Sequence, residues 1–136
     1  EVLFGEQLEV VKRIHKWIYI KLNLDHYSGW IEEQNLIEYV KPTHRVITQK
    51  IIIKKAPDIK SNSISYISMG SFVKVLGTQE KWAKILLPED NVGYVPKNHI
   101  KPLDLKENNW IEKSILMLGM PYLWGGRGLV GIDCSG

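Results

Sequence analysis

Residues 1–40 alternate short apolar runs with polar turns. The runs at 8–11 and 17–22 are rich in β-branched and aromatic residues, a composition typical of strands. A third run at 27–31 follows a turn-forming stretch of Asn, Asp and His. Pro42 then interrupts the pattern, because proline cannot donate a ladder hydrogen bond and disfavours helix before it. The pattern predicts a small β unit that ends near residue 40.

Residues 44–103 repeat this pattern at greater length. A β-branched run at 45–54 predicts one long strand, and runs at 72–77 and 82–87 predict two more around a Thr-Gln-Glu turn. A Pro-Glu-Asp-Asn turn then leads into a short strand at 92–95. We therefore expect a second β unit over these residues.

The two units match each other as internal repeats. Each contains a Lys-Trp pair, then a glycine followed by an aromatic and an aliphatic residue, and then a further aliphatic residue seven positions after the glycine. The paired positions are Trp17 with Trp82, Gly29 with Gly93, and Leu36 with Ile100. A repeat of this kind indicates one small β unit used twice. The unit resembles the bacterial SH3-type small barrel. We therefore expect Trp17, Trp30 and Trp82 to fill the barrels, and the glycines to lie where the backbone bends or is closely approached.

The hydrophobic period changes after residue 105. Ile111, Ile115 and Leu118 are spaced at i, i+4 and i+7, which predicts an amphipathic helix near residues 108–118. The boundary signals are Asn109 as N-cap, Glu112 three residues later as in a capping box, and Gly119 and Pro121 as stops. A third unit with α+β character therefore spans residues 105–136.

Composition and charge narrow the class of protein. Hydrophobic residues make up 44% and charged residues 24% of the chain, as in soluble globular proteins. No apolar run approaches the ~20 residues that a membrane span needs. The net charge of +3 is spread along the chain rather than gathered in the basic patch that nucleic-acid binding requires. The single cysteine excludes an internal disulfide, and no metal-binding motif is present, so we expect no cofactor.

The last sixteen residues carry the candidate chemistry. They contain the only cysteine, Cys134, after a glycine-rich stretch that leaves room for an extended substrate backbone. If a helix begins there, its N-terminal dipole favours the thiolate, which is the reactive form. Tyr122 and Trp124 alternate on a short extended piece and could form a pocket wall. A lone cysteine is also a common buried filler, so the surrounding residues must decide between these interpretations.

The surrounding string resembles the nucleophile region of NlpC-type cysteine peptidases, which act on bacterial cell walls. The matching residues are Gly119-x-Pro121-Tyr122-x-Trp124-Gly125-Gly126 and Gly131-x-Asp133-Cys134-Ser135-Gly136. Two SH3-type units ahead of it resemble the branch that cleaves between γ-D-glutamate and an L-diamino acid in murein peptides. The resemblance implies a mostly β fold, with two tandem SH3-like barrels (1–40, the first incomplete at its N-terminal side, and 44–103) followed by the first helix and nucleophile loop of an α+β, papain-like domain (105–136).

The resemblance also implies a role for each residue of the string. Cys134 is expected to attack the γ-D-glutamyl carbonyl, and its neighbours Asp133 and Ser135 to line the substrate site. Tyr122 and Trp124 match the aromatic positions of the pocket wall. The expected partners are therefore murein peptides, bound by a monomer.

Two residues of the first unit enter the same expectation. Tyr27 lies in Asp25-His26-Tyr27-Ser28-Gly29-Trp30, which resembles the family's Asp-Gly-Tyr-x-Gly-Trp. The resemblance implies that this tyrosine helps to bind the free amine of the substrate's L-alanine, and that Glu6 is an acidic residue in the same role. His26 replaces the family's glycine, but histidine tolerates left-handed backbone better than most residues. The structural alternatives are a barrel-edge aromatic for Tyr27 and an ordinary barrel position for Glu6.

The family's histidine base follows its cysteine, whereas the histidines of this sequence, His15, His26, His44 and His99, all precede Cys134. A cysteine without a base is weakly activated, so these residues alone are not expected to hydrolyse peptides. The sequence begins with Glu1 inside a strand-like pattern, and we expect a chain truncated at both ends. The cytoplasm, where murein is recycled, and the cell envelope both fit this expectation.

Two other hypotheses stay open. In one, the barrels form a binding or targeting module for cell-wall peptides without catalysis, because they are the only complete units. In the other, the chain is a decayed gene product whose apolar helix and tail lack a packing partner, which would promote association.

Overall fold

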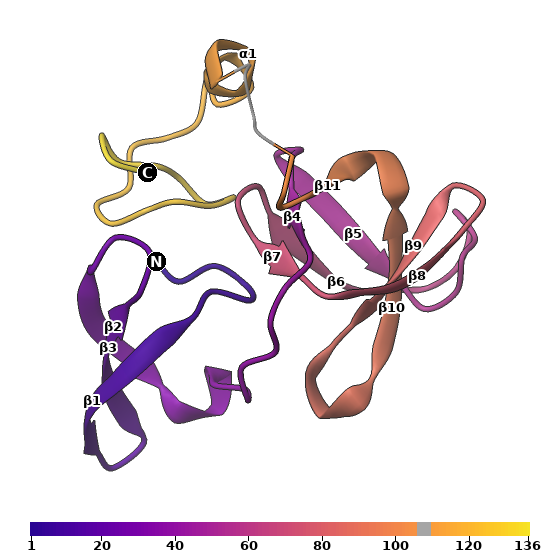
Figure 1. Cartoon of the computed structure of the whole chain (residues 1–136). Helices are drawn as coiled ribbons and strands as arrows, with labels where there is room; N and C mark the ends of the chain where they lie inside the picture. Colours follow the sequence, from indigo (N-terminus) through magenta and orange to yellow (C-terminus); the bar gives the residue numbers. More distant parts are fainter. Residues whose placement is uncertain (106–109) are drawn as a thin grey trace.

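The structure, a computed structural model, describes residues 1–105 and 110–136, apart from the side chain of Trp110. The candidate N-cap Asn109 lies outside the described residues. As predicted, the fold is mostly β, with several antiparallel sheets and, among the described residues, one short α-helix (Figure 1).

The first module is a three-stranded antiparallel meander. Its elements are β1 (Leu8–Ile14), β2 (Trp17–Leu22), β3 (Ser28–Glu32) and the 3-10 turn η1 (Glu33–Asn35). Buried and more exposed side chains alternate along β2, as expected for a strand with one face on a core. Its inward residues Ile18, Ile20 and Leu22 are at most 2% exposed and form the centre of that core.

The second module has two sheets, with strand orders β6-β5-β10-β9-β8 and β11-β4-β7. Its strands are β4 (His44–Val46), β5 (Lys50–Lys54), β6 (Ser63–Ser68), β7 (Phe72–Val73), β8 (Val75–Gln79), β9 (Trp82–Leu86), β10 (Val92–Pro96) and β11 (Ile100–Pro102), with 3-10 turns η2 (Pro88–Asp90) and η3 (Lys97–His99). Both sheets contribute to one core, whose buried residues are Val46, Ile51, Ile53, Ile67, Val73, Ala83, Ile85, Val95 and Ile100.

Two predicted strands are each divided between these sheets. The run at 45–54 bends after Val46, so that β4 pairs with β7 and β11 whereas β5 pairs with β6 and β10. The run at 72–77 divides at Lys74 into β7 and β8. Polar residues mark both bends, Thr48 and Gln49 in the first run and Lys74 in the second. The apolar residues on either side of each bend face one shared core, so each run reads as a single strand in the sequence.

The internal repeat is confirmed down to the strand register. The equivalent pairs are Trp17–Glu32 and Ile20–Gly29 between β2 and β3, and Trp82–Pro96 and Ile85–Gly93 between β9 and β10. The hairpins β1–β2 and β8–β9 also carry a bulge at equivalent residues, Val11 and Leu76. His15 and Glu80 take the same left-handed conformation in the two hairpin turns, with φ of 50° and 49°.

The expectation that the repeat tryptophans fill the cores is wrong for two of the three. Trp17 and Trp30 are exposed, and Trp82 is half-buried. Trp17 faces outward because the inward positions of β2 are taken by isoleucine and leucine, and successive side chains of a strand face opposite sides. Trp30 lies against Tyr19, with ring centroids 5.2 Å apart.

The N-terminal segment, residues 1–7, connects the two modules. Val2 packs against the core of the first module, whereas Phe4 packs against the core of the second. The Phe72 N–H donates to the Phe4 carbonyl oxygen at 2.8 Å. Leu3 between them is buried. The same short stretch therefore completes two hydrophobic cores.

The C-terminal segment, residues 110–136, begins with α1 (Trp110–Ile115). The predicted helix continued to Leu118, but after α1 the chain tightens into turns, with N–H groups of residues 117 and 118 bonded three residues back. Lys113 donates to the Ile47 carbonyl oxygen at 2.9 Å, and the Gln49 amide donates to the carbonyl oxygen of Leu116. These bonds hold α1 against the second module, while the final loop lies beside the first (Figure 1). No helix in the described part of the chain is long and apolar enough to cross a membrane.

Candidate active site

Residues 121–136 form a compact loop that presents Cys134. Two backbone hydrogen bonds of 3.1 Å join the two halves of the loop. The Leu123 N–H donates to the Ile132 carbonyl oxygen, and the Ile132 N–H donates to the Pro121 carbonyl oxygen. The two halves of the loop approach so closely that a Cβ at Gly126 would lie 2.5 Å from the Gly131 carbonyl oxygen, which explains the glycine there. The Cys134 thiol is free and exposed.

Asp133 holds the turn around this thiol. Its Oδ1 accepts the Ser135 N–H at 2.9 Å and the Ser135 hydroxyl at 2.8 Å, and its Oδ2 accepts the Gly125 N–H at 2.9 Å. These donors, the Ser135 hydroxyl first, favour the ionised carboxylate and lower the pKa of Asp133. A side-chain oxygen bonded to the N–H two residues later forms an Asx-turn, which places Cys134 at the middle position of a turn between Asp133 and Ser135.

Arg127 connects this loop to the first module, and sequence analysis did not identify it. Its Nη1 lies 2.9 Å from Glu6 Oε1 and 3.7 Å from Asp25 Oδ2. Its backbone N–H donates to Glu1 Oε2 at 2.8 Å. In the sequence Arg127 stands out only as an arginine among glycines, and this local pattern does not indicate which residues it contacts.

Glu6 is held mainly through one oxygen, since Oε1 lies within ion-pair distance of Arg127 but has no hydrogen-bond partner. Its side chain is 2% exposed, and its Oε2 accepts the Leu3 N–H at 2.8 Å and Arg127 Nη1 at 3.1 Å. A carboxylate this buried is stable only with such partners. Glu6 therefore faces Arg127, not open solvent.

A cavity of about 320 Å³ lies between the first module and the nucleophile loop. Its lining residues are Glu1, Leu22, Asp25, Tyr27, Gly125, Arg127, Asp133 and Ser135. Three of the residues predicted for the substrate site, Tyr27, Asp133 and Ser135, thus line one cavity although more than one hundred positions separate the first from the others. The predicted residues Tyr122 and Trp124 do not line it, and both are exposed.

The turn that carries Tyr27 has a defined geometry. The Tyr27 N–H donates to Asp25 Oδ1 at 2.9 Å, and the His26 N–H donates to the Leu22 carbonyl oxygen at 3.1 Å. His26 has φ of 61°, so the left-handed conformation expected of a glycine replacement is present. Tyr27 itself is half exposed at the cavity.

Comparison with known protein families assigns the two modules. Residues 50–101 match the family described as bacterial SH3 domain, and residues 1–36 match the family described as bacterial dipeptidyl-peptidase Sh3 domain. The chain contains two bacterial SH3 domains. The resemblance of both repeat units to this fold is thereby confirmed.

Three curated relatives match these SH3 domains together with the C-terminal segment. They are dipeptidyl-peptidase 6 of Lysinibacillus sphaericus (21% identical) and the gamma-D-glutamyl-L-lysine dipeptidyl-peptidases of Bacillus subtilis strain 168 (28%) and Bacillus cereus ATCC 10987 (24%). Each match covers 100% of this chain and, in that order, 58%, 49% and 47% of the relative. The chain thus spans about half the length of the curated relatives it matches.

A solved structure has the same fold. The crystal structure of an NlpC/P60 family protein from Bacillus cereus ATCC 10987 superposes with a TM-score of 0.79 at 22% identity, over 98% of this chain and 50% of that one.

Proposed function

We propose that residues 1–136 form the substrate-recognition modules and nucleophile loop of a cysteine peptidase that cleaves murein-derived peptides after γ-D-glutamate, before the L-diamino acid. The observation that carries the proposal is the cavity between Tyr27 and the two neighbours of Cys134. The names of the relatives, two of which are gamma-D-glutamyl-L-lysine dipeptidyl-peptidases, support the same bond specificity.

In this proposal the three residues of the turn have different roles. Cys134 is the nucleophile, and Asp133 orients the turn because all of its hydrogen-bonding capacity observed here is used within the loop. Ser135 lines the substrate site, and its hydroxyl donates to Asp133 Oδ1. The base that takes the thiol proton must be a histidine from outside these residues, since none of the four described histidines bonds to Cys134.

We further assign recognition of the substrate's free α-amine to Tyr27 and Asp25. Both line the cavity, and a phenol oxygen and a carboxylate are suitable acceptors for an ammonium group. Glu6 acts indirectly in this assignment, because its carboxylate holds Arg127 and Arg127 lies beside Asp25. Tyr122 and Trp124 remain candidates for a wall that a larger domain would complete.

Binding of L-Ala-γ-D-Glu-L-Lys to the 136-residue chain tests this assignment. We expect NMR shift changes at Tyr27 and residues 133–135, and an affinity loss of about 5–100-fold when the α-amine is acetylated, since blocking it leaves buried polar groups unpaired, at ~1–3 kcal/mol each. Asp25→Asn should weaken binding of the free peptide and reduce its advantage over the acetylated one. Equal binding of both peptides by the wild-type chain would contradict the assignment.

The alternative function is a cell-wall peptide-binding module without catalysis, and the match of residues 1–36 and 50–101 to bacterial SH3 domains supports it. The gene sequence downstream of the Gly136 codon separates the two. An open frame with a histidine on a predicted strand supports the peptidase, and Cys134→Ser in that longer protein should then abolish hydrolysis while binding persists. A long open frame without such a histidine would leave only the binding module.

A further inference from the structure

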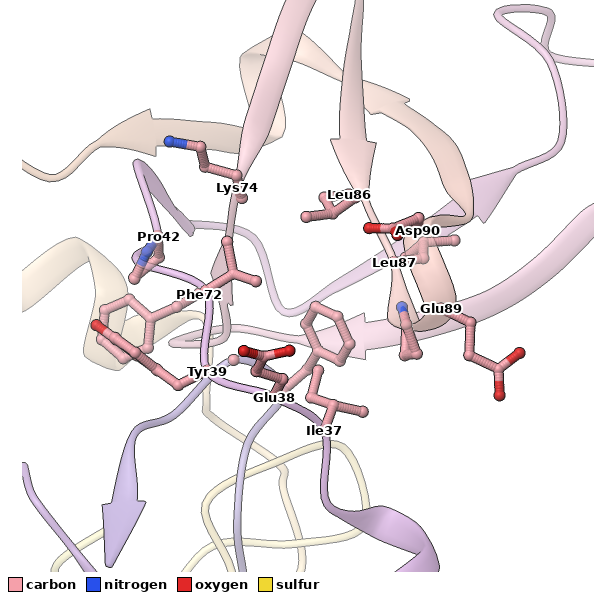
Figure 2. Close-up of a pocket in the computed structure, with 14 residues that line it drawn as sticks. Ile37, Glu38, Tyr39, Pro42, Phe72, Lys74, Leu86, Leu87, Glu89 and Asp90 are labelled. Carbon is pink, nitrogen blue, oxygen red and sulfur yellow. The ribbon is translucent and has the colours of Figure 1, made fainter.

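A second pocket, of about 210 Å³, lies where the linker between the modules meets the second module. Figure 2 shows it between linker residues 37–42 on one side and the end of β9 with turn η2 on the other. It shares no lining residue with the cavity beside Cys134. Pockets for drug-sized molecules usually measure ~300–1,000 Å³, so this one fits a single side chain.

Much of the pocket wall is apolar and uncovered. The linker residues Ile37, Tyr39 and Val40 line it and are 49%, 48% and 45% exposed. Phe4 and Phe72 add two aromatic rings from the N-terminal segment and β7. An unbranched aliphatic chain would bury this surface, and aromatic rings also attract a cation at the end of such a chain.

The polar groups at the pocket favour a cation. Glu38, Glu89 and Asp90 line it with one basic residue, Lys74, in a chain whose net charge is +3. In the described part of the chain these four side chains form no ion pair with one another. Figure 2 shows the carboxylates of Glu38 and Asp90 on facing sides of the pocket, while the Lys74 ammonium and the Glu89 carboxylate extend away from it.

We propose that this pocket binds the side chain of an L-lysine residue in a murein peptide, with the aliphatic stem on Tyr39 and Ile37 and the ammonium between Glu38 and Asp90. The ligand class is that of the proposed function, on which the inference rests, but the site is separate and Cys134 has no part in it. A diaminopimelate side chain would bring an additional carboxylate against Glu38 and Asp90, so the pocket discriminates against it.

The test uses the whole 136-residue chain, isotope-labelled for NMR, and the peptide acetyl-L-Ala-γ-D-Glu-L-Lys-amide. The acetyl group keeps this probe from the amine-recognising cavity at Tyr27. We expect shift changes at residues 37–42 and 86–90. The matched peptide acetylated on the lysine side chain, and the matched diaminopimelate peptide, should both bind more weakly, by about fivefold to tenfold.

The variants are chosen to change charge without changing shape. The double variant Glu38→Gln and Asp90→Asn should weaken binding of the lysine peptide by about fivefold to tenfold, since each exposed ion pair contributes up to about fivefold. Asparagine suits the left-handed backbone at Asp90, where φ is 58°. Glu80→Gln is the control, because Glu80 is an exposed acid with φ of 49° that does not line the pocket. It should leave the affinity unchanged.

Three results would overturn the inference. The first is equal binding of the lysine peptide and its side-chain-acetylated form, and the second is unchanged affinity in the double variant. The third is a set of shifts at residues 37–42 that depend on protein concentration without peptide, which would show that a second copy of the chain occupies the pocket. If the free-amine peptide shifts Tyr27 while the blocked peptide leaves residues 37–42 unchanged, this inference fails and the proposed function stands. If instead the blocked peptide shifts residues 37–42 while the free-amine peptide leaves Tyr27 unchanged, amine recognition at Tyr27 fails and the lysine pocket stands.

Discussion

In the second module β10 lies between β9 and β5, whereas its counterpart in the first module, β3, pairs within the described residues with β2 alone. The difference is visible at the repeat glycines. A Cβ at Gly93 would overlap with the Ile53 side chain on β5, whereas a Cβ at Gly29 would meet nothing within 4 Å. The three-stranded meander and its register are thus common to both modules, and the covering strands are not.

This comparison separates two kinds of information in the sequence. Register, bulge and turn depend on neighbouring residues, and they recur in both modules with a similar local pattern. Core size depends on how many further strands pack over the meander. The first module has three buried core residues and takes part of its packing from Val2 of the N-terminal segment, whereas the second has nine.

The largest expected effect is a difference in stability loss when equivalent core isoleucines of the two modules are replaced by alanine. Ile85→Ala should destabilise the second module by about 3–5 kcal/mol, because a cavity enclosed by two sheets cannot collapse. The equivalent change in the first module, Ile20→Ala, should cost about 2 kcal/mol, since a sheet covered on one side relaxes more easily. Hydrogen exchange resolved by residue measures both. Equal costs would show that the first core is as tightly enclosed as the second.

The repeat glycines give a smaller and sharper contrast. Gly93→Ala should cost about 1–3 kcal/mol, because the new methyl group must displace the fully buried Ile53. Gly29→Ala adds the same atom at the same register position in open space, so it should change stability by less than about 0.5 kcal/mol. Thermal unfolding of the two variants provides the measurement. A comparable loss in Gly29→Ala would mean that some element covers β3 in solution.

The smallest expected effect is a pH dependence confined to the second module. Burial lowers the pKa of His44, and nearby Asp104 opposes this in part. Because the folded-state pKa lies below the unfolded value of 6.5, this contribution to stability is complete above pH 6.5 and is lost as pH falls through the folded-state pKa. Protection of β4 amides should therefore decrease on acidification below pH 6.5, and His44→Asn should flatten that decrease.

Local features of the fold could be predicted from the sequence. The paired tryptophans and glycines gave the repeat, and the spacing of Ile111 and Ile115 gave the helix. The burial of the aromatic residues was predicted wrongly. Trp17 and Trp82 share one register position, and in both strands the alternate residues, Ile18 and Ala83 first, take the inward sites.

The site shows the same division. Cys134 and its neighbours are site candidates in the sequence because the whole string around them resembles the nucleophile region of a peptidase family. The ion pairs of Arg127 with Glu6 and Asp25 depend on how three distant segments meet, and no local pattern contains that information. The sequence therefore presents Asp25 only as part of the Tyr27 motif, and it does not indicate that Glu6 contacts Arg127.

The N-terminal segment has a consequence for how sequences of this architecture can vary in length. Val2 and Phe4 belong to different cores, Leu3 is buried between them, and Glu6 must reach Arg127. Inserting or deleting one residue here would displace at least one of these contacts, whereas the loop from β5 to β6 can change length freely because exposed residues predominate in it. In related sequences, insertions and deletions should therefore occur in the loop between β5 and β6 and should be absent from the first six positions.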